Sequence, residues 1–125
     1  MSRVQLPVNV SDSGAAVAFC SRLSGTAPAK LHPGYANFAV DDPPLKLVLN
    51  SPGNGPGGTI NHLGAGVGST AEVTDAGDRL AAGGVTTEAE PGAVCCYARQ
   101  DKVRARDPDG LAWEYYTVLE HVETP

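Results

Sequence analysis

The sequence has few of the residues that disulfide-rich, nucleic-acid-binding or membrane-spanning proteins need. It holds three cysteines in 125 residues, two of them adjacent, and such a set makes no disulfide framework. Lys and Arg number 9 against 14 Asp and Glu, a net charge of −5, which argues against nucleic-acid binding. No apolar run approaches the ~18 residues of a membrane span, and no signal peptide is visible. We therefore expect a protein of the reducing cytoplasm that binds neither nucleic acid nor membrane.

The composition is that of a folded domain. Hydrophobic residues make up 42% of the chain and charged residues 18%, as in ordinary globular proteins. The length suffices for one domain with a core and is short for two ordinary ones. The abundant glycines and prolines, 15 and 10 respectively, gather between segments of regular hydrophobic pattern, where they mark turns.

The same succession of patterns occurs twice along the chain. In the first half, apolar residues alternate from Val4 to Val10, which predicts a strand. Ser11-Asp12 and Gly25 then bound a predicted helix. The second half has a predicted strand at 60–67 and a helix that opens with the capping box Ser69–Glu72 and ends at Gly83-Gly84. The further strands predicted lie at 29–32, 35–40 and 45–49 in the first half, and near 85–88, 96–99, 103–105 and 113–118 in the second.

An offset of 57 residues superposes the two halves, so that Leu6 meets Leu63 and Gln5 meets His62. Each half then reads strand, helix and further strands, a unit that cannot close a core alone. We predict an α+β fold of two βαβββ modules, forming a curved sheet with a cleft lined by polar strand faces. The modules are placed at about 2–50 and 59–118, with a linker at about 51–58 and a tail at 119–125. They could pair within one chain or between two.

The adjacent thiols of Cys95 and Cys96 form the most unusual segment. Neighbouring Cα atoms lie about 3.8 Å apart, short of the ~4.4–6.8 Å of a disulfide, and a strand would turn the two side chains to opposite faces. Gripping one ligand therefore requires a loop, which Pro91 and Gly92 would suit. The alternative is a pair of small buried hydrophobes.

Two neighbours of the thiols are further candidates. Lys102, expected with Asp101 in a hairpin loop, is a candidate substrate-binding residue that could attract an anion or lower a thiol pKa. Tyr97 is either a packing aromatic or a gate over the thiols, and in the second role it is the candidate catalytic residue.

Three residues could bind a divalent metal ion. Gln5 and His62 occupy equivalent positions of the repeat, and Glu114 lies inside a strand that also holds Trp113. A carboxylate there is costly to bury unless it is paired or metal-bound. One nitrogen and two oxygen ligands suit Fe(II), Mn(II) or Zn(II). Taken singly, Gln5 also fits a solvated strand residue, and His62 a core or surface histidine.

The last turn and several longer segments resemble a known superfamily. Asp107-Pro108-Asp109-Gly110, followed four residues later by Glu114, resembles the last hairpin of vicinal oxygen chelate proteins, which include glyoxalase I and extradiol dioxygenases. The segments 33–39, 43–49, 61–64 and 95–103 are similar to the cadmium-induced protein and carbon–arsenic lyase family, and the similarity runs from about residue 2 to 118.

This resemblance implies a non-haem Fe(II) enzyme that uses O₂ to cleave the carbon–arsenic bond of trivalent organoarsenicals, giving arsenite. Gln5, His62 and Glu114 then match the metal ligands, while Cys95 and Cys96 match the arsenic-binding thiols. The expected partners are an organoarsenical or a soft metal ion, O₂ and, in one alternative, a second copy of the chain.

The sequence departs from the family at two positions and leaves two other functions open. Cys20 and Arg104 stand where relatives often carry an aromatic residue and a tryptophan. One alternative function is a cadmium- or arsenite-binding resistance protein without catalysis. The other is a glyoxalase-like lyase, which is disfavoured because Lys46 stands roughly where that reading expects a fourth, carboxylate ligand.

Overall fold

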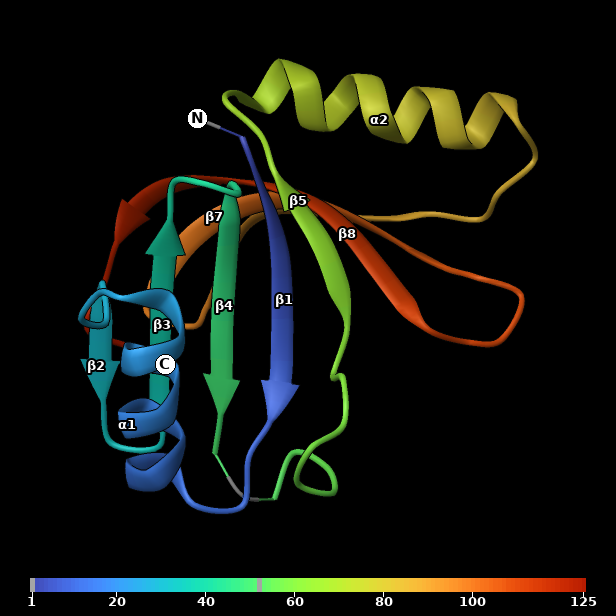
Figure 1. Cartoon of the computed structure of the whole chain (residues 1–125). Coiled ribbons are helices and arrows are strands. Elements are labelled where there is room, and N and C mark those ends of the chain that lie inside the picture. Colours follow the sequence, from blue (N-terminus) through green and yellow to red (C-terminus); the bar gives the residue numbers. More distant parts are fainter. Residues whose placement is uncertain (1, 52) are drawn as a thin grey trace. The chain divides into compact units, whose positions relative to one another are not determined.

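The computed structural model describes residues 2–51 and 53–125, which divide into two compact units. The first unit comprises Arg3–Leu63, and the second comprises Gly64–Pro125 together with Ser2. Each unit runs strand, helix and three strands (Figure 1), which confirms the βαβββ repeat predicted from the sequence. Among the described residues, no helix has both the length and the apolar character needed to cross a membrane.

The first unit is a four-stranded sheet with one helix. Its elements are β1 (Arg3–Asn9), α1 (Ser13–Ser24), β2 (Lys30–His32), β3 (Tyr35–Val40) and β4 (Leu45–Asn50). The strand order is β2-β3-β4-β1, as Figure 1 shows. The β1–β4 pair is parallel and the other two pairs are antiparallel.

Helix α1 begins and ends at the residues that the sequence indicates. The Asp12 carboxylate caps it by accepting a 3.0 Å hydrogen bond from the Ala15 N–H, and Gly25 ends it in the left-handed conformation with φ 71°. Its buried residue Cys20 packs against Phe38 and Leu47 of the sheet. The helix therefore covers one face of the sheet, and Cys20 belongs to the core.

The second unit repeats this arrangement. It consists of β5 (Leu63–Gly66), whose first residue is the last of the first unit, α2 (Thr70–Ala82), β6 (Glu88–Cys95), β7 (Ala98–Arg106) and β8 (Ala112–His121), in the sheet order β5-β8-β7-β6. The predicted division of 85–118 into four short strands is wrong, because three longer strands run antiparallel through it. The predicted strand at 60–67 is also shorter than expected, since β5 spans only four residues.

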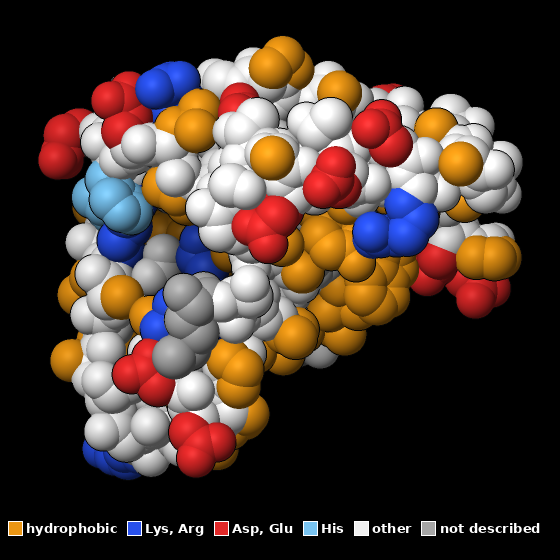
Figure 2. All heavy atoms as spheres, turned by 90° about the horizontal axis from the view of Figure 1, so that it is seen from above, with side chains coloured by type: hydrophobic (Ala, Val, Ile, Leu, Met, Phe, Trp, Pro, Cys, Tyr) orange, Lys and Arg blue, Asp and Glu red, His pale blue; other side chains and the backbone are white. Residues whose placement is uncertain are grey.

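Helix α2 covers one face of this second sheet. The Ser69 hydroxyl caps it by accepting a 3.3 Å hydrogen bond from the Glu72 N–H, as the capping box predicts. Val73 and Ala76 pack against Val103 of β7. The opposite side of the helix is exposed and carries acidic side chains, which Figure 2 shows in red.

The face of each sheet that its helix leaves uncovered carries buried polar side chains. Strand alternation places them on one side, and we call these the polar faces: Gln5, Asn9 and Asn37 in the first unit, and Gln100, Lys102 and Glu114 in the second. Buried polar groups need partners to offset their lost hydration. The polar faces are therefore where a functional site is to be sought.

The end of the segment predicted as a linker is built into the first unit. Pro52 lies outside the described residues. Residues 58–61, further along the chain, run antiparallel to β1. The Gly58 N–H donates to the Asn9 carbonyl at 2.8 Å, the Asn9 N–H donates to the Thr59 carbonyl at 2.8 Å, and the Asn61 N–H donates to the Pro7 carbonyl at 2.9 Å. The segment just before His62 is thus held against β1.

Candidate functional site: a thiol pair, a buried lysine and a carboxylate

The thiol pair lies at the turn between β6 and β7. Cys95 is the last residue of β6 and pairs with Ala98, so Cys96 and Tyr97 alone form the connection. Both have positive φ, 58° and 62°, the conformation of a type I′ hairpin turn, which favours Asn and Gly. Non-glycine residues held in this left-handed backbone conformation cost about 1–3 kcal/mol each and often mark functional sites.

The predicted loop thus exists, but it follows Cys95 instead of surrounding Gly92. Gly92 lies inside β6, in the register shift between Glu90 and Ala93. Pro91 also belongs to this strand. The two thiols reach one side because Cys95 ends a strand and Cys96 begins a turn.

Cys95 is surrounded by hydrogen-bond donors. The Cys96 side chain donates to its sulfur, the Lys102 Nζ lies 3.3 Å from Sγ, and the Gln100 Nε2 lies 3.5 Å from it. The Cys96 hydrogen bond is the largest cause that lowers the pKa of Cys95, followed by the charge and hydrogen bond of Lys102. Burial and the charge of Glu114 oppose them, and the resulting pKa is about 5. Cys95 is therefore a thiolate at neutral pH.

Lys102 connects this thiolate to the carboxylate. The prediction that it lies in a loop is wrong, because it sits within β7 with its residue 3% exposed. Its Nζ is 3.6 Å from the Glu114 Oε2 and 3.3 Å from the Cys95 Sγ. A buried ammonium is costly unless it is paired, and here two anions offset that cost.

Glu114 is a buried, paired carboxylate, one of the two states expected from its sequence position. It is 5% exposed on β8. Besides Lys102, it lies 3.4 Å from the Nε of Arg104, its cross-strand neighbour on β7. Arg104 also reaches Glu90 at 3.1 Å. Charges of alternating sign thus run across the polar face of the second unit from Glu90 to the Cys95 sulfur.

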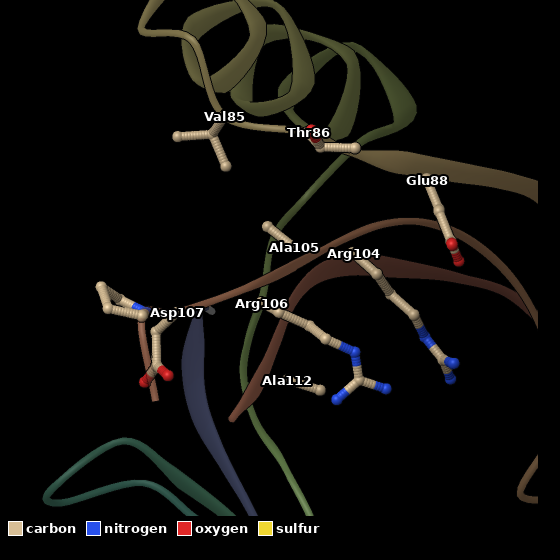
Figure 3. Close-up of a pocket in the computed structure, with 9 residues that line it drawn as sticks. Val85, Thr86, Glu88, Arg104, Ala105, Arg106, Asp107 and Ala112 are labelled. Atoms are coloured by element: carbon tan, nitrogen blue, oxygen red, sulfur yellow. The ribbon is translucent and has the colours of Figure 1, made fainter. Parts of the chain in front are cut away.

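A pocket of about 560 Å³ opens beside Arg104 in the same unit. Arg104 and Arg106 extend from β7 into it, with Glu88 of β6 beside Arg104 (Figure 3). Ala105 and Ala112 contribute apolar surface. The volume falls within the ~300–1,000 Å³ range of small-molecule sites, so the pocket can take an organic group of modest size.

The first unit holds the two remaining candidates. Gln5 is 6% exposed, and its Oε1 atom is buried without a hydrogen-bond partner among the described residues. An orphaned oxygen of this kind costs about 1–3 kcal/mol, which a metal ion bound to it would offset. His62 precedes β5, with its Nδ1 2.8 Å from the Asn61 Oδ1. Ligating histidines commonly have such a partner on their second nitrogen, so both residues fit a metal ion.

The candidate residues therefore form two groups. Cys95, Cys96, Lys102 and Glu114 lie together in the second unit, while Gln5 and His62 belong to the first. Among the described residues, no group of three or more His, Cys, Asp or Glu side chains is arranged to hold a metal ion. A site that joins Gln5 and His62 to Glu114 stays a prediction, as does the cleft.

Sequence reasoning missed part of the second group. Gln100 contacts Cys95, and its alternation with Lys102 along one strand would have indicated it had the turn been placed at 96–97. Tyr97 is 9% exposed in that turn, as expected of a packing aromatic, and its catalytic role stays a prediction.

This fold and sequence define the class of protein. The chain belongs to the Glyoxalase/Bleomycin resistance protein/Dioxygenase superfamily, whose model matches residues 3–115. The superfamily resemblance inferred from the Asp107–Gly110 turn and Glu114 is thereby confirmed. The fold is also that of homoprotocatechuate 2,3-dioxygenase from Arthrobacter globiformis, with a TM-score of 0.66 and 24% identity over 95% of this chain and 36% of that chain.

Two relatives narrow the comparison further. The chain is 56% identical over 125 residues to "Cadmium-induced protein CadI" of Mycobacterium bovis, covering 99% of this chain and 81% of the relative. It is 47% identical over 124 residues to the "Trivalent organoarsenical cleaving enzyme" of Thermomonospora curvata, covering 99% and 82% respectively. The similarity to the cadmium-induced and carbon–arsenic lyase family is confirmed by both.

Proposed function

We propose that this protein is an Fe(II)-dependent enzyme that uses O₂ to cleave the carbon–arsenic bond of trivalent organoarsenicals. The observation that carries the proposal is the Cys95 thiolate, held beside Cys96 and joined through Lys102 to the buried Glu114. A relative of 47% identity bears the name trivalent organoarsenical cleaving enzyme, which supports the same substrate class.

The thiol pair captures the substrate by ligand exchange. An organoarsenical with two hydroxyl groups on As(III) exchanges both for sulfur, and two As–S bonds replace two As–O bonds. Cys95 reacts as a thiolate, because its pKa is about 5, and Cys96 gives up its proton. That proton and one from solvent leave with the two hydroxides as water, so no oxidation is involved. Soft trivalent arsenic prefers thiolate to oxygen or nitrogen ligands.

Lys102 orients the captured group. Its ammonium lies between the thiol and Glu114, at 3.3 Å and 3.6 Å, so it fixes the sulfur relative to the carboxylate. Holding a substrate in one orientation converts a bimolecular encounter into a positioned one.

Gln5, His62 and Glu114 would hold the ferrous ion. Their amide oxygen, imidazole nitrogen and carboxylate are ligands that iron accepts, whereas the thiols select arsenic. The bound ion supplies the activation of O₂. This ligand set needs both units, so the proposal requires them to pair, within one chain or in a homodimer. Tyr97, beside the thiols, is the proposed catalytic residue that closes over the bound arsenical.

Aerobic turnover tests the proposal directly. Protein loaded anaerobically with Fe(II) is mixed with methylarsenite and air, and arsenite is measured by chromatography with elemental detection. The expected result is arsenite formation that is lost in Cys95→Ser/Cys96→Ser and in Glu114→Gln. A Cys20→Ser variant is the matched thiol control and should retain activity. Absence of arsenite with the wild type, or normal turnover by the double serine variant, contradicts the proposal.

A second candidate is a protein that binds cadmium or arsenite without catalysis. The low pKa of Cys95 favours soft-metal binding whether or not iron is present, and a relative of 56% identity is named a cadmium-induced protein. Measuring arsenite affinity and arsenite production together in Glu114→Ala separates the two candidates. Under both, the variant binds arsenite through its thiols, but only an enzyme loses an activity along with Glu114.

A further inference from the structure

A directional chain of hydrogen bonds leads to the His62 ring in the first unit. It starts at the Pro56 carbonyl and passes through the side chains of Thr59, Asn9 and Asn61. The distances between successive atoms are 2.6, 3.0, 3.1 and 2.8 Å. All four side chains belong to the first unit.

The direction of each hydrogen bond follows from the first. A carbonyl oxygen only accepts, so the single Thr59 hydroxyl proton points to Pro56 and the hydroxyl accepts from the Asn9 Nδ2. The Asn9 Oδ1 is thereby left to accept from the Asn61 Nδ2. The Asn61 Oδ1 therefore faces the His62 Nδ1 and can only accept from it. The proton of the neutral ring is thus fixed on Nδ1.

The backbone around this chain holds it in place. Asn9, 4% exposed at the end of β1, exchanges backbone hydrogen bonds with Gly58 and Thr59, both 2.8 Å long. Gly55 lies so close that a Cβ there would stand 2.6 Å from the Asn9 Nδ2. The Asn9 carboxamide is therefore enclosed by the returning segment, which limits its freedom to rotate and reverse the chain.

We propose that Asn9, Asn61 and Thr59 are positioning residues that fix His62 as its Nδ1–H tautomer and so present the Nε2 lone pair for metal binding. The inference rests on the proposed function in that the metal site is part of it. Ligating histidines depend on such outer partners, and losing one costs about 10- to 100-fold in metal affinity. Three side chains that bind no metal themselves would then set the tautomer, and with it the metal affinity, of His62.

Nitrogen NMR of the metal-free protein reads the tautomer directly. Long-range ¹H–¹⁵N correlation spectra of ¹⁵N-histidine-labelled protein, recorded where imidazole is neutral, distinguish protonated from unprotonated ring nitrogens. A His62→Gln spectrum assigns the signals against His32 and His121. The wild type should show a protonated Nδ1. Asn61→Ala should move the proton toward Nε2, which free imidazole side chains favour, whereas Asn61→Asp keeps an acceptor and should restore Nδ1–H.

Two further variants separate the chain from general damage to the fold. Thr59→Val keeps the side-chain shape but removes the hydroxyl, and should weaken the Nδ1–H preference less than Asn61→Ala does. Asn54→Ala is the matched control, because the Asn54 Nδ2 donates to the backbone and hydroxyl oxygens of Ser51 in the same segment and takes no part in the chain to His62. It should leave the His62 spectrum unchanged.

Mn(II) binding, followed by the electron paramagnetic resonance signal of the free ion, supplies the affinity. Asn61→Ala should bind about 10- to 100-fold more weakly than wild type, with Asn54→Ala unchanged. A wild-type Nε2–H tautomer, or an Nδ1–H tautomer that survives Asn61→Ala, overturns the inference. Nδ1–H in wild-type protein that binds no Mn(II) instead contradicts the proposed metal site and leaves the hydrogen-bond chain standing.

Discussion

The ionisation of Cys95 gives the sharpest test of the thiol site. Its pKa is about 5 against an ordinary value of 9.0, a difference of 9.0 − 5, or about four units. At pH 7 the thiolate fraction is therefore about 99%, compared with about 1% for an ordinary thiol. Removing the donors should reverse most of this shift. Cys96→Ala removes the largest single cause and Lys102→Met removes two smaller ones, so each should raise the pKa of Cys95, and the double variant should raise it most.

Glu114 should act in the opposite direction. Its negative charge raises the pKa of Cys95, so Glu114→Gln should lower that pKa further below 5. Cys96→Ala and Glu114→Gln should thus shift the pKa of Cys95 in opposite directions. General loosening of the site would instead raise that pKa toward the ordinary thiol value in both variants, so opposite shifts exclude it.

The assay must follow ionisation and not reactivity alone. A thiolate whose pKa falls by four units loses roughly 40- to 100-fold in intrinsic nucleophilicity, which nearly cancels its ~100-fold greater abundance at pH 7. The ultraviolet absorbance of the thiolate, titrated from acid to alkaline pH, avoids this compensation. Wild type should show a step near pH 5 that Cys95→Ser abolishes. A wild-type step close to the ordinary thiol pKa would refute the reasoning.

Three further predictions concern the framework around the sites. Asp101 accepts hydrogen bonds that lower its pKa, the largest cause first from a threonine hydroxyl and then from a backbone N–H. Its charge therefore stabilises the fold above the ordinary carboxyl pKa, and this is lost as pH falls through the lowered value. Asp101→Asn should cost about 1 kcal/mol in urea unfolding at neutral pH, and an equal loss in acid would contradict this account. Phe38→Ala should lower the free energy of unfolding by about 3–5 kcal/mol, because Phe38 is fully buried. Phe19 is 62% exposed, so Phe19→Ala serves as the control and should change that free energy little. Gly55→Ala should both destabilise the first unit and disturb the Asn9 carboxamide, seen as a shifted His62 nitrogen spectrum, and an unchanged spectrum would show that the carboxamide adapts.

The architecture was largely predictable because its signals are local. The Asp12 cap, the Gly25 end and the Ser69–Glu72 capping box each act within a few residues, so a linear reading finds them. Repetition of the pattern then indicated the βαβββ unit. Strand boundaries after residue 85 were not predictable, because nothing in a Cys96-Tyr97 pair signals a type I′ turn.

The site was predictable in its residue types and not in their contacts. Glu114 stood out because a carboxylate between aromatics needs a partner. Lys102 was misplaced in a loop because β7 was predicted as two short strands with a hairpin between them. Its burial depends on two anions that only the sheet register brings near. The chain from Thr59 to His62 depends on a linker folding back against β1, and the sequence contains no local signal for that.

The two-residue turn helps to set the register of β6 against β7, and with it the position of the Cys95 sulfur relative to Lys102. Side chains alternate along β6 and β7, so a shift of one strand against the other by a single residue would carry the Cys95 sulfur to the opposite side of the sheet from Lys102. The register of these two strands is therefore as necessary to the site as the cysteines are. A relative that keeps both cysteines but pairs these strands in another register would lack the contact between the lysine and the thiolate.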